Sequence, residues 1–133
     1  MSLTTYLFDT DVLIAYLRNY EETIELLQGL AEAGHTLATT SVTVVEIEAG
    51  IRPAEEEATR ALLDNLTVYQ LDYPTARLAG KYIRQHRQQG TTLGLADAII
   101  AATTISHQLI LITYNPRHYP MPEIKLHSVT TRL

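Results

Sequence analysis

The sequence predicts an α/β fold, a sandwich in which helices cover a mostly parallel central sheet. Short apolar runs of strand character alternate along the chain with segments of helical periodicity, and this alternation is typical of β-α-β units. One run, residues 109–113 (LILIT), is apolar at four of its five positions, as expected of a central strand that is buried on both faces. With 133 residues, the chain has the length of one domain.

The first half of the chain contains two predicted strands and two predicted helices, followed by a third helix. Residues 4–8 (TTYLF) are the first strand, and apolar residues at helical spacing follow in residues 11–18. Residues 21–34 form an amphipathic helix with acidic residues in its first turn and a glycine at its end. After a short strand at residues 35–40, Ser41 is expected to cap the helix SVTVVEIEAGI.

The second half repeats the alternation. Pro53 is expected to open the helix PAEEEATRALLDNL, because proline is tolerated in a first helical turn. Residues 67–71 (TVYQL) are the third strand, and residues 74–90 are a long helix that stops at a glycine. Thr91 or Thr92 is the expected cap of the helix LGLADAIIAATTISHQ. The remaining predicted elements are a strand at 109–113, the loop YNPRHYP and a last strand at 124–129.

Composition narrows the classes of function. The chain has no cysteine, which excludes disulfides and thiolate metal sites and is compatible with a reducing compartment. It shows no signal-peptide pattern and no apolar run of membrane-spanning length, so a cytoplasmic protein without a membrane segment is expected. The net charge of -5 is unlike that of proteins that hold nucleic acid mainly through its phosphates. An enzyme whose bound metal ions supply positive charge locally remains compatible.

Four polar positions interrupt apolar surroundings: Asp9, Glu46, Asp97 and Asn115. Asp9 and Asn115 follow predicted strands, where sites form in open parallel sheets. An unpaired carboxylate buried among the apolar neighbours of Asp97 would be costly unless it is neutralised, paired or bound to a cation. Carboxylate and amide oxygens suit Mg²⁺ or Mn²⁺, and such an ion can activate water to hydrolyse a phosphodiester bond.

Each of these positions also has a simpler structural explanation. Asp9 and Asp97 could serve only as caps or first-turn charges of the helices that begin beside them. Glu46 could be a solvated helix residue, and its neighbour Glu48 is an equally acidic candidate. Asn115 could be a turn residue before a proline. The joint placement of the four residues is what favours a metal site.

Four segments, in order and spanning nearly the whole chain, resemble a known family. They are YLFDTDVLIAYLR, SVTVVEIEAGI, LGLADAIIAATTISHQLILIT and TYNPRHYP. In these segments the chain is similar to PIN-domain proteins, and more narrowly to VapC-type toxin ribonucleases of type II toxin–antitoxin systems. The third segment is the most specific, because in it an aspartate is followed by a helix of small residues and an apolar strand.

The resemblance implies a single PIN domain over residues 1–133 with a PIN-like α/β/α sandwich. It implies an endoribonuclease that depends on Mg²⁺ (or Mn²⁺), with metal-site residues at Asp9, Glu46 and Asp97 and a fourth catalytic position at Asn115. The family further implies a homodimer and a VapB-type antitoxin whose C-terminal segment lies across the active-site groove. Structured RNAs such as tRNA are frequent targets in such toxins. Whether one or two ions bind stays open, because the amide at the fourth position carries no charge.

Two other functions compete with this interpretation. Asp9 and Asp11 form the D-x-D run of dehalogenase-like phosphatases, but Val12 and Leu13 follow where that signature has a small residue and a threonine. Neither lysine of the chain lies in a suitable loop. We therefore interpret Asp11 as a first-turn helix charge. The second alternative is a PIN-type module with weak catalysis that binds RNA or protein, and the retained carboxylates argue against it.

Basic and polar side chains offer candidate contacts for the substrate. Arg77 and Arg84 lie with Lys81 at helical spacing, so they share one face of the long helix and could meet RNA phosphates. A solvated helix face explains this basic stripe equally well. Arg52, just past the helix that carries the glutamates, could contact substrate or acidic groups of an antitoxin. Thr113, close to the predicted site, is the remaining candidate.

Overall fold

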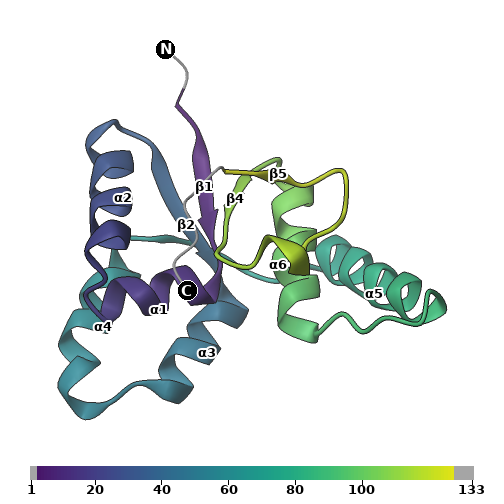
Figure 1. The fold of residues 1–133 in the computed structure, drawn as a ribbon, viewed down its shortest axis with the longest axis horizontal. Coiled ribbons are helices and arrows are strands. Elements are labelled where there is room, and N and C mark those ends of the chain that lie inside the picture. Colours follow the sequence, from purple (N-terminus) through teal and green to yellow (C-terminus); the bar gives the residue numbers. More distant parts are fainter. Residues whose placement is uncertain (1–2, 128–133) are drawn as a thin grey trace.

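Five parallel strands form one sheet in the computed structural model, which describes residues 3–127 (Figure 1). The strand order is β3-β2-β1-β4-β5, and each neighbouring pair within these residues is parallel. The predicted α/β class with a mostly parallel sheet is therefore confirmed. The strands are β1 (Thr5–Phe8), β2 (Thr36–Thr40), β3 (Thr67–Tyr69), β4 (Ile110–Ile112) and β5 (Lys125–Leu126).

Helices lie on both sides of this sheet, with α2 and α4 on one side and α5 and α6 on the other (Figure 1). Between residues 3 and 127, no helix combines the length and the apolar character that crossing a membrane requires. The α-helices are α1 (Thr10–Leu17), α2 (Glu21–Glu32), α3 (Ser41–Gly50), α4 (Glu56–Asp64), α5 (Tyr73–Gln88) and α6 (Leu95–Ser106), and the 3₁₀ helices are η1 (Pro53–Glu55) and η2 (Pro116–His118).

Successive residues of the two central strands supply two separate cores, because side chains of a strand alternate between its faces. Leu7 and Leu111 pack in a cluster with α5 and α6, whereas Phe8 and Ile112 pack in a second cluster with α1, α2, α3 and α4. All four side chains are fully buried. The strands β1 and β4 are thus the centre of an α/β/α sandwich, and residues that follow them are held by both cores.

The small residues of α6 allow it to lie close to its neighbours. Ala98, Ala101 and Ala102 are fully buried between the sheet and α5. The hydroxyls of Thr103 and Thr104, also buried, donate to carbonyl oxygens four residues earlier in the helix. The helix therefore buries its polar groups with their hydrogen bonds satisfied, and its first turn has a fixed position at the end of the sheet.

Two helix caps differ from the prediction. Thr40, not Ser41, caps α3, because Thr40 keeps an extended backbone while its hydroxyl oxygen accepts a backbone N–H three residues later, at 3.2 Å. Gly94 precedes α6 and provides no side-chain cap. The prediction that Thr91 or Thr92 caps this helix is therefore wrong, because both residues come before the N-cap position, which Gly94 occupies.

Some predicted bounds also change. Pro53 opens the short helix η1, and α4 begins only at Glu56. The last strand was predicted at 124–129, but β5 spans Lys125–Leu126, and residues 128 and 129 lie outside the described residues. The third strand is likewise shorter than predicted and ends at Tyr69.

Candidate active site

Polar residues converge where the carboxyl ends of β1, β2 and β4 meet the first turns of α1, α3 and α6. Asp9 follows β1 directly, and its backbone N–H donates to the carbonyl oxygen of Ile112 at the end of β4, at 2.9 Å. This hydrogen bond continues the ladder between the two central strands by one residue. The parallel register therefore brings Asp9 beside Thr113, although the two residues are far apart in the sequence.

Asp9 is buried, with 6% of its surface exposed, and both of its carboxylate oxygens are hydrogen-bonded. Oδ1 accepts the backbone N–H of Thr10 at 2.7 Å, so Asp9 is the N-cap of α1. Oδ2 accepts hydroxyl protons from Thr113 at 2.7 Å and from Tyr119 at 2.9 Å. Burial raises the pKa of Asp9 above its ordinary value, and these hydrogen bonds reduce the rise. Asp9 is thus a helix cap and also part of a larger polar network.

Asp97, in the first turn of α6, is connected to Asp9 through Tyr119. The Tyr119 hydroxyl lies 3.2 Å from Asp97 Oδ1 and 2.9 Å from Asp9 Oδ2. The other oxygen of Asp97 lies 3.2 Å from His118 Nδ1. Both oxygens of this partly exposed carboxylate are therefore held by residues at the end of η2.

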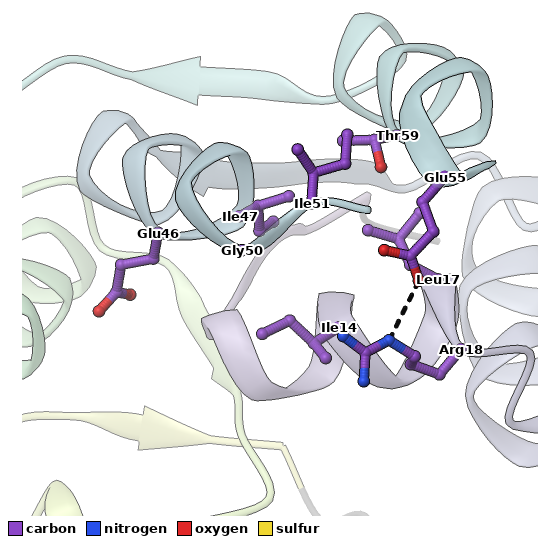
Figure 2. Close-up of a pocket in the computed structure, with 9 residues that line it drawn as sticks. All are labelled: Ile14, Leu17, Arg18, Glu46, Ile47, Gly50, Ile51, Glu55 and Thr59. Atoms are coloured by element: carbon purple, nitrogen blue, oxygen red, sulfur yellow. Dashed lines mark hydrogen bonds and ion pairs between the residues drawn. The ribbon is translucent and has the colours of Figure 1, made fainter. Parts of the chain in front are cut away.

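Glu46 is connected to Asp9 through Thr10. The Thr10 hydroxyl donates to Glu46 Oε1 at 2.7 Å, and the Thr10 backbone N–H is the group that Asp9 caps. Glu46 and Glu48 are both exposed on α3, so neither is buried inward, but only Glu46 has this link among the described residues. Figure 2 shows Glu46 at one end of a pocket, with its carboxylate directed away from the Arg18–Glu55 ion pair at the other end.

Three carboxylates from different parts of the chain therefore share one continuous network. Its order is Asp97, Tyr119, Asp9, Thr10 and Glu46, with a hydroxyl-bearing residue between each pair of acids. Among residues 3–127, no three acidic or histidine side chains stand close enough together to form a ready metal cluster. The carboxylates are thus linked through hydroxyl and backbone groups, not through direct contact.

The Tyr119 hydroxyl shows why this network suits a cation. Burial and the charges of Asp9 and Asp97 raise the pKa of Tyr119 far above its usual range, so the phenol keeps its proton. One proton can be donated to only one of the two carboxylates at a time. The carboxylate oxygen that does not receive this proton then faces the hydroxyl oxygen of Tyr119. This contact needs additional positive charge, from a proton on that carboxyl group or from a bound cation. Carboxylate oxygens in this arrangement suit a hard divalent ion.

Asp11 was interpreted from sequence as a first-turn helix charge, and the structure gives it a more specific environment. Its Oδ2 accepts the backbone N–H of Tyr114 at 3.2 Å and the side-chain amide of Asn115 at 2.6 Å. Its Oδ1 is buried and has no hydrogen-bond partner among the described residues. Burial, with the nearby charge of Asp9, raises the pKa of Asp11 to about 6. The sequence feature that could have indicated this environment is the DTD run, because it places a second carboxylate close to Asp9.

Asn115 lies beside the network and forms no hydrogen bond with its three carboxylates among the described residues. Its side-chain amide donates to Asp11, and its backbone N–H donates to the Thr113 hydroxyl oxygen at 3.0 Å. Thr113 in turn donates to Asp9. Asn115 therefore supports the site through two neighbours.

The predicted basic contacts lie away from the network. Arg77 and Arg84 are exposed on α5, on the side opposite the buried Ala79 and Tyr82. The Arg77 guanidinium lies 5.9 Å from the ring centroid of Tyr73. Within residues 3–127, no hydrogen bond or ion pair joins these arginines to the site carboxylates.

Arg52 is exposed at the start of η1, where its backbone N–H donates to Glu55 Oε1 at 3.0 Å. Its side chain has no ion pair with the network in the described part of the chain. Arg52 is therefore available at the surface between α3 and α4.

A groove beside Asp97 contains basic residues that are not among the site residues predicted from the sequence. Arg117 and His118, from η2, line this groove with Asp97. Thr91 and Thr92, from the segment before α6, contribute hydroxyl groups to it. Two basic side chains thus lie directly beside Asp97, whereas Arg77 and Arg84 do not line this groove.

The sequence profile of the PIN domain matches residues 6–124, which is most of the chain and includes every residue of the network. The chain belongs to the PIN-domain family. This confirms the family predicted from the four segments, and with it the PIN-like α/β/α sandwich. The prediction of a single PIN domain over residues 1–133 stays a prediction, because the match ends at residue 124.

Individual relatives agree with this assignment. Ribonuclease VapC10 of Mycobacterium tuberculosis is 37% identical over 117 residues, covering 88% of this chain and 87% of VapC10. The structure of VapBC2 from Rickettsia felis bound to a promoter DNA fragment superposes with a TM-score of 0.83 at 19% identity, covering 93% of this chain and 98% of that one. A toxin–antitoxin complex from Klebsiella pneumoniae gives a TM-score of 0.77 at 26% identity, covering 96% and 99%.

The environment of Asp11 predicts a pH-dependent gain in stability for Asp11→Asn. A folded-state pKa of about 6 against an ordinary value of 3.8 means that protonated Asp11 favours the folded protein, and this contribution is lost as pH rises through 6. Asparagine does not ionise and keeps an oxygen for the same donors. The free energy of unfolding is measured in urea with EDTA present. The value for the variant minus that for the wild type should be larger at pH 7.5 than at pH 4. A difference that is constant with pH, or that shrinks at pH 7.5, would contradict the raised pKa.

Proposed function

We propose that this PIN domain is a divalent-metal-dependent endoribonuclease that hydrolyses RNA phosphodiester bonds, acting as the toxin of a toxin–antitoxin pair. The observation that carries the proposal is the network that links Asp9, Glu46 and Asp97 at the carboxyl edge of the sheet. The reaction is supported by the 37% identity to VapC10, which is named as a ribonuclease. The dehalogenase-like phosphatase alternative has no comparable support, because the chain belongs to another family.

In the proposed mechanism, Asp9, Glu46 and Asp97 hold Mg²⁺ or Mn²⁺. When bound, the ion supplies an activated water and neutralises charge on the phosphate and its leaving oxygen. The protein's own residues fix the ligands: Thr113 orients the Asp9 carboxylate by a hydrogen bond at 2.7 Å. Asn115 contributes through its backbone N–H, which donates to the Thr113 hydroxyl oxygen and so keeps this hydroxyl in place. Because Asp9 is buried, water reaches the site from the sides of the exposed Glu46 and the partly exposed Asp97.

The proposed partners follow from the family. A VapB-type antitoxin is supported by the Klebsiella pneumoniae structure, which is a toxin–antitoxin complex at 26% identity. The exposed Arg52 is a candidate contact for acidic groups of that antitoxin. We further propose a homodimer and a cytoplasmic place of action, where the RNA substrate is found.

The groove beside Asp97 is the proposed path of the RNA strand. Arg117 can neutralise a phosphate directly next to the site, which offsets the repulsion expected from a chain of net charge -5, and the His118 ring offers a further polar contact in the same groove. The stripe that contains Arg77 and Arg84 remains a candidate for more distant phosphates. Its position on the outer side of α5 makes a contact with the scissile region less direct.

Removal of the metal or of one ligand should abolish cleavage. Purified protein free of antitoxin is incubated with total RNA in Mg²⁺ or Mn²⁺, and Asp97→Asn is compared with Asp64→Asn, a matched change at an exposed position on α4. The Asp97 variant should lose more activity than the roughly 10–100-fold that removal of an outer-shell partner costs, whereas the Asp64 variant should cut normally. EDTA should stop the wild type. Cleavage that persists in EDTA or in the Asp97 variant would refute metal catalysis here, and no cleavage by folded wild type would favour a binding module.

Single-turnover cleavage of a short RNA at several salt concentrations tests the RNA path. Arg117→Ala should raise the half-saturating protein concentration and lower the salt slope by about one, because one phosphate contact is lost. Arg84→Ala is the matched control and should have the smaller effect. A larger effect of Arg84→Ala would instead place the RNA along α5.

A further inference from the structure

Tyr119 occupies a position that the mechanism above does not yet use. Its ring is 2% exposed and packs in the core cluster formed by α5, α6 and one face of the sheet. Its hydroxyl projects out of that cluster and lies 2.9 Å from Asp9 Oδ2 and 3.2 Å from Asp97 Oδ1. Among residues 3–127, no other side chain hydrogen-bonds to both carboxylates. One rigidly packed phenol thus connects the two acids that arrive from β1 and α6.

We propose that Tyr119 is a positioning residue that holds Asp9 and Asp97 at a separation that a single divalent cation can bridge. This inference rests on the proposed metal site and adds a residue that sets the site's affinity. Tyr119 acts through the two carboxylates and does not itself need to touch the ion or the RNA.

Electrostatic repulsion is the reason that such a residue is needed. Two carboxylates near each other in a partly buried site repel strongly, because the effective dielectric constant there is lower than in water. Without a donor between them, the side chains would turn apart or take up a proton. The hydroxyl of Tyr119 stands between the two oxygens and can donate its proton to either of them, and the buried ring fixes its place relative to the core.

The other contacts of these carboxylates do not perform this task. Thr113 donates to Asp9 alone, and His118 contacts Asp97 alone from a side chain that is 53% exposed. The hydrogen bond from Tyr119 also leaves one oxygen of Asp9 able to bind an ion. Asp9 Oδ1 accepts only the Thr10 backbone N–H among the described residues, so this oxygen keeps a free lone pair.

Tyr82 provides a matched control for removal of the hydroxyl. It is buried, with 6% of its surface exposed, and belongs to the same core cluster. Its hydroxyl donates to a carboxylate oxygen of Glu123 at 3.1 Å, outside the network. Tyr82→Phe therefore removes one hydroxyl–carboxylate hydrogen bond from a tyrosine of the same core cluster without changing the network.

The test is the affinity of the metal-free protein for Mn²⁺, measured by isothermal titration calorimetry without RNA. Tyr119→Phe should raise the Kd about tenfold or more, as expected when an outer-shell partner is lost, whereas Tyr82→Phe should leave it close to the wild-type value. An unchanged or tighter Kd in Tyr119→Phe would overturn the proposal, and so would equal weakening in both variants. No Mn²⁺ binding by the wild type would refute the metal site itself, which is a separate failure.

A second measurement covers the case in which Tyr119→Phe does not fold. Substoichiometric Mn²⁺ is added to wild-type protein with labelled tyrosine rings, and paramagnetic broadening is followed by NMR. The ring signals of Tyr119 should broaden more strongly than those of Tyr82, whose hydroxyl bonds to Glu123 outside the network. Sharp Tyr119 signals at a concentration of Mn²⁺ that binds the protein would overturn the proposal.

Discussion

The burial of one carboxylate, Asp9, at the end of the central strand β1 is the constraint on which the rest of the site depends. A buried charge is tolerated only when its oxygens are satisfied. The start of α1 supplies the backbone N–H of Thr10, the end of β4 supplies Thr113, and the segment after η2 supplies Tyr119. A helix start, a strand register and a loop path are therefore all fixed by the same carboxylate. Burial nevertheless raises the pKa of Asp9 above its ordinary value, and the nearby charge of Asp97 adds to the rise.

The fold brings the acids together by a simple arrangement. Parallel strands place their carboxyl ends at one edge of the sheet, and the helices α1 and α3 begin there directly after β1 and β2, whereas α6 follows α5. Asp9 comes from the end of β1, Glu46 from α3 after β2, and Asp97 from the first turn of α6. The small residues of α6 keep that helix close to the sheet, so its first turn reaches the segment after β4. Residues that are distant in sequence thus share a network that ordinary core packing holds in place.

The architecture and the identity of the acids could be predicted from the sequence because both depend on local patterns. The alternation of strand and helix predicts the parallel sheet, and isolated carboxylates in apolar segments stand out. Hydrogen-bond partners depend on loop paths that no local pattern specifies. In the sequence Tyr119 is only one aromatic of the segment TYNPRHYP, and its place between two acids depends on the path of the chain through η2. Asp11 looked like a helix charge, since its burial against the segment after β4 depends on that same loop. The stripe with Arg84 was visible from its spacing, but its distance from the network was not.

The central claim is that the network around Asp9 and Asp97 binds a divalent cation. The most direct test is diffraction from crystals grown with Mn²⁺, recorded where manganese scatters anomalously. We expect an anomalous peak between the two carboxylates, within about 2.0–2.3 Å of an oxygen of each, a range near that of octahedral Mg²⁺ sites. A peak bound by other residues, or no ordered ion while Tyr119 still bridges the two acids, would contradict it.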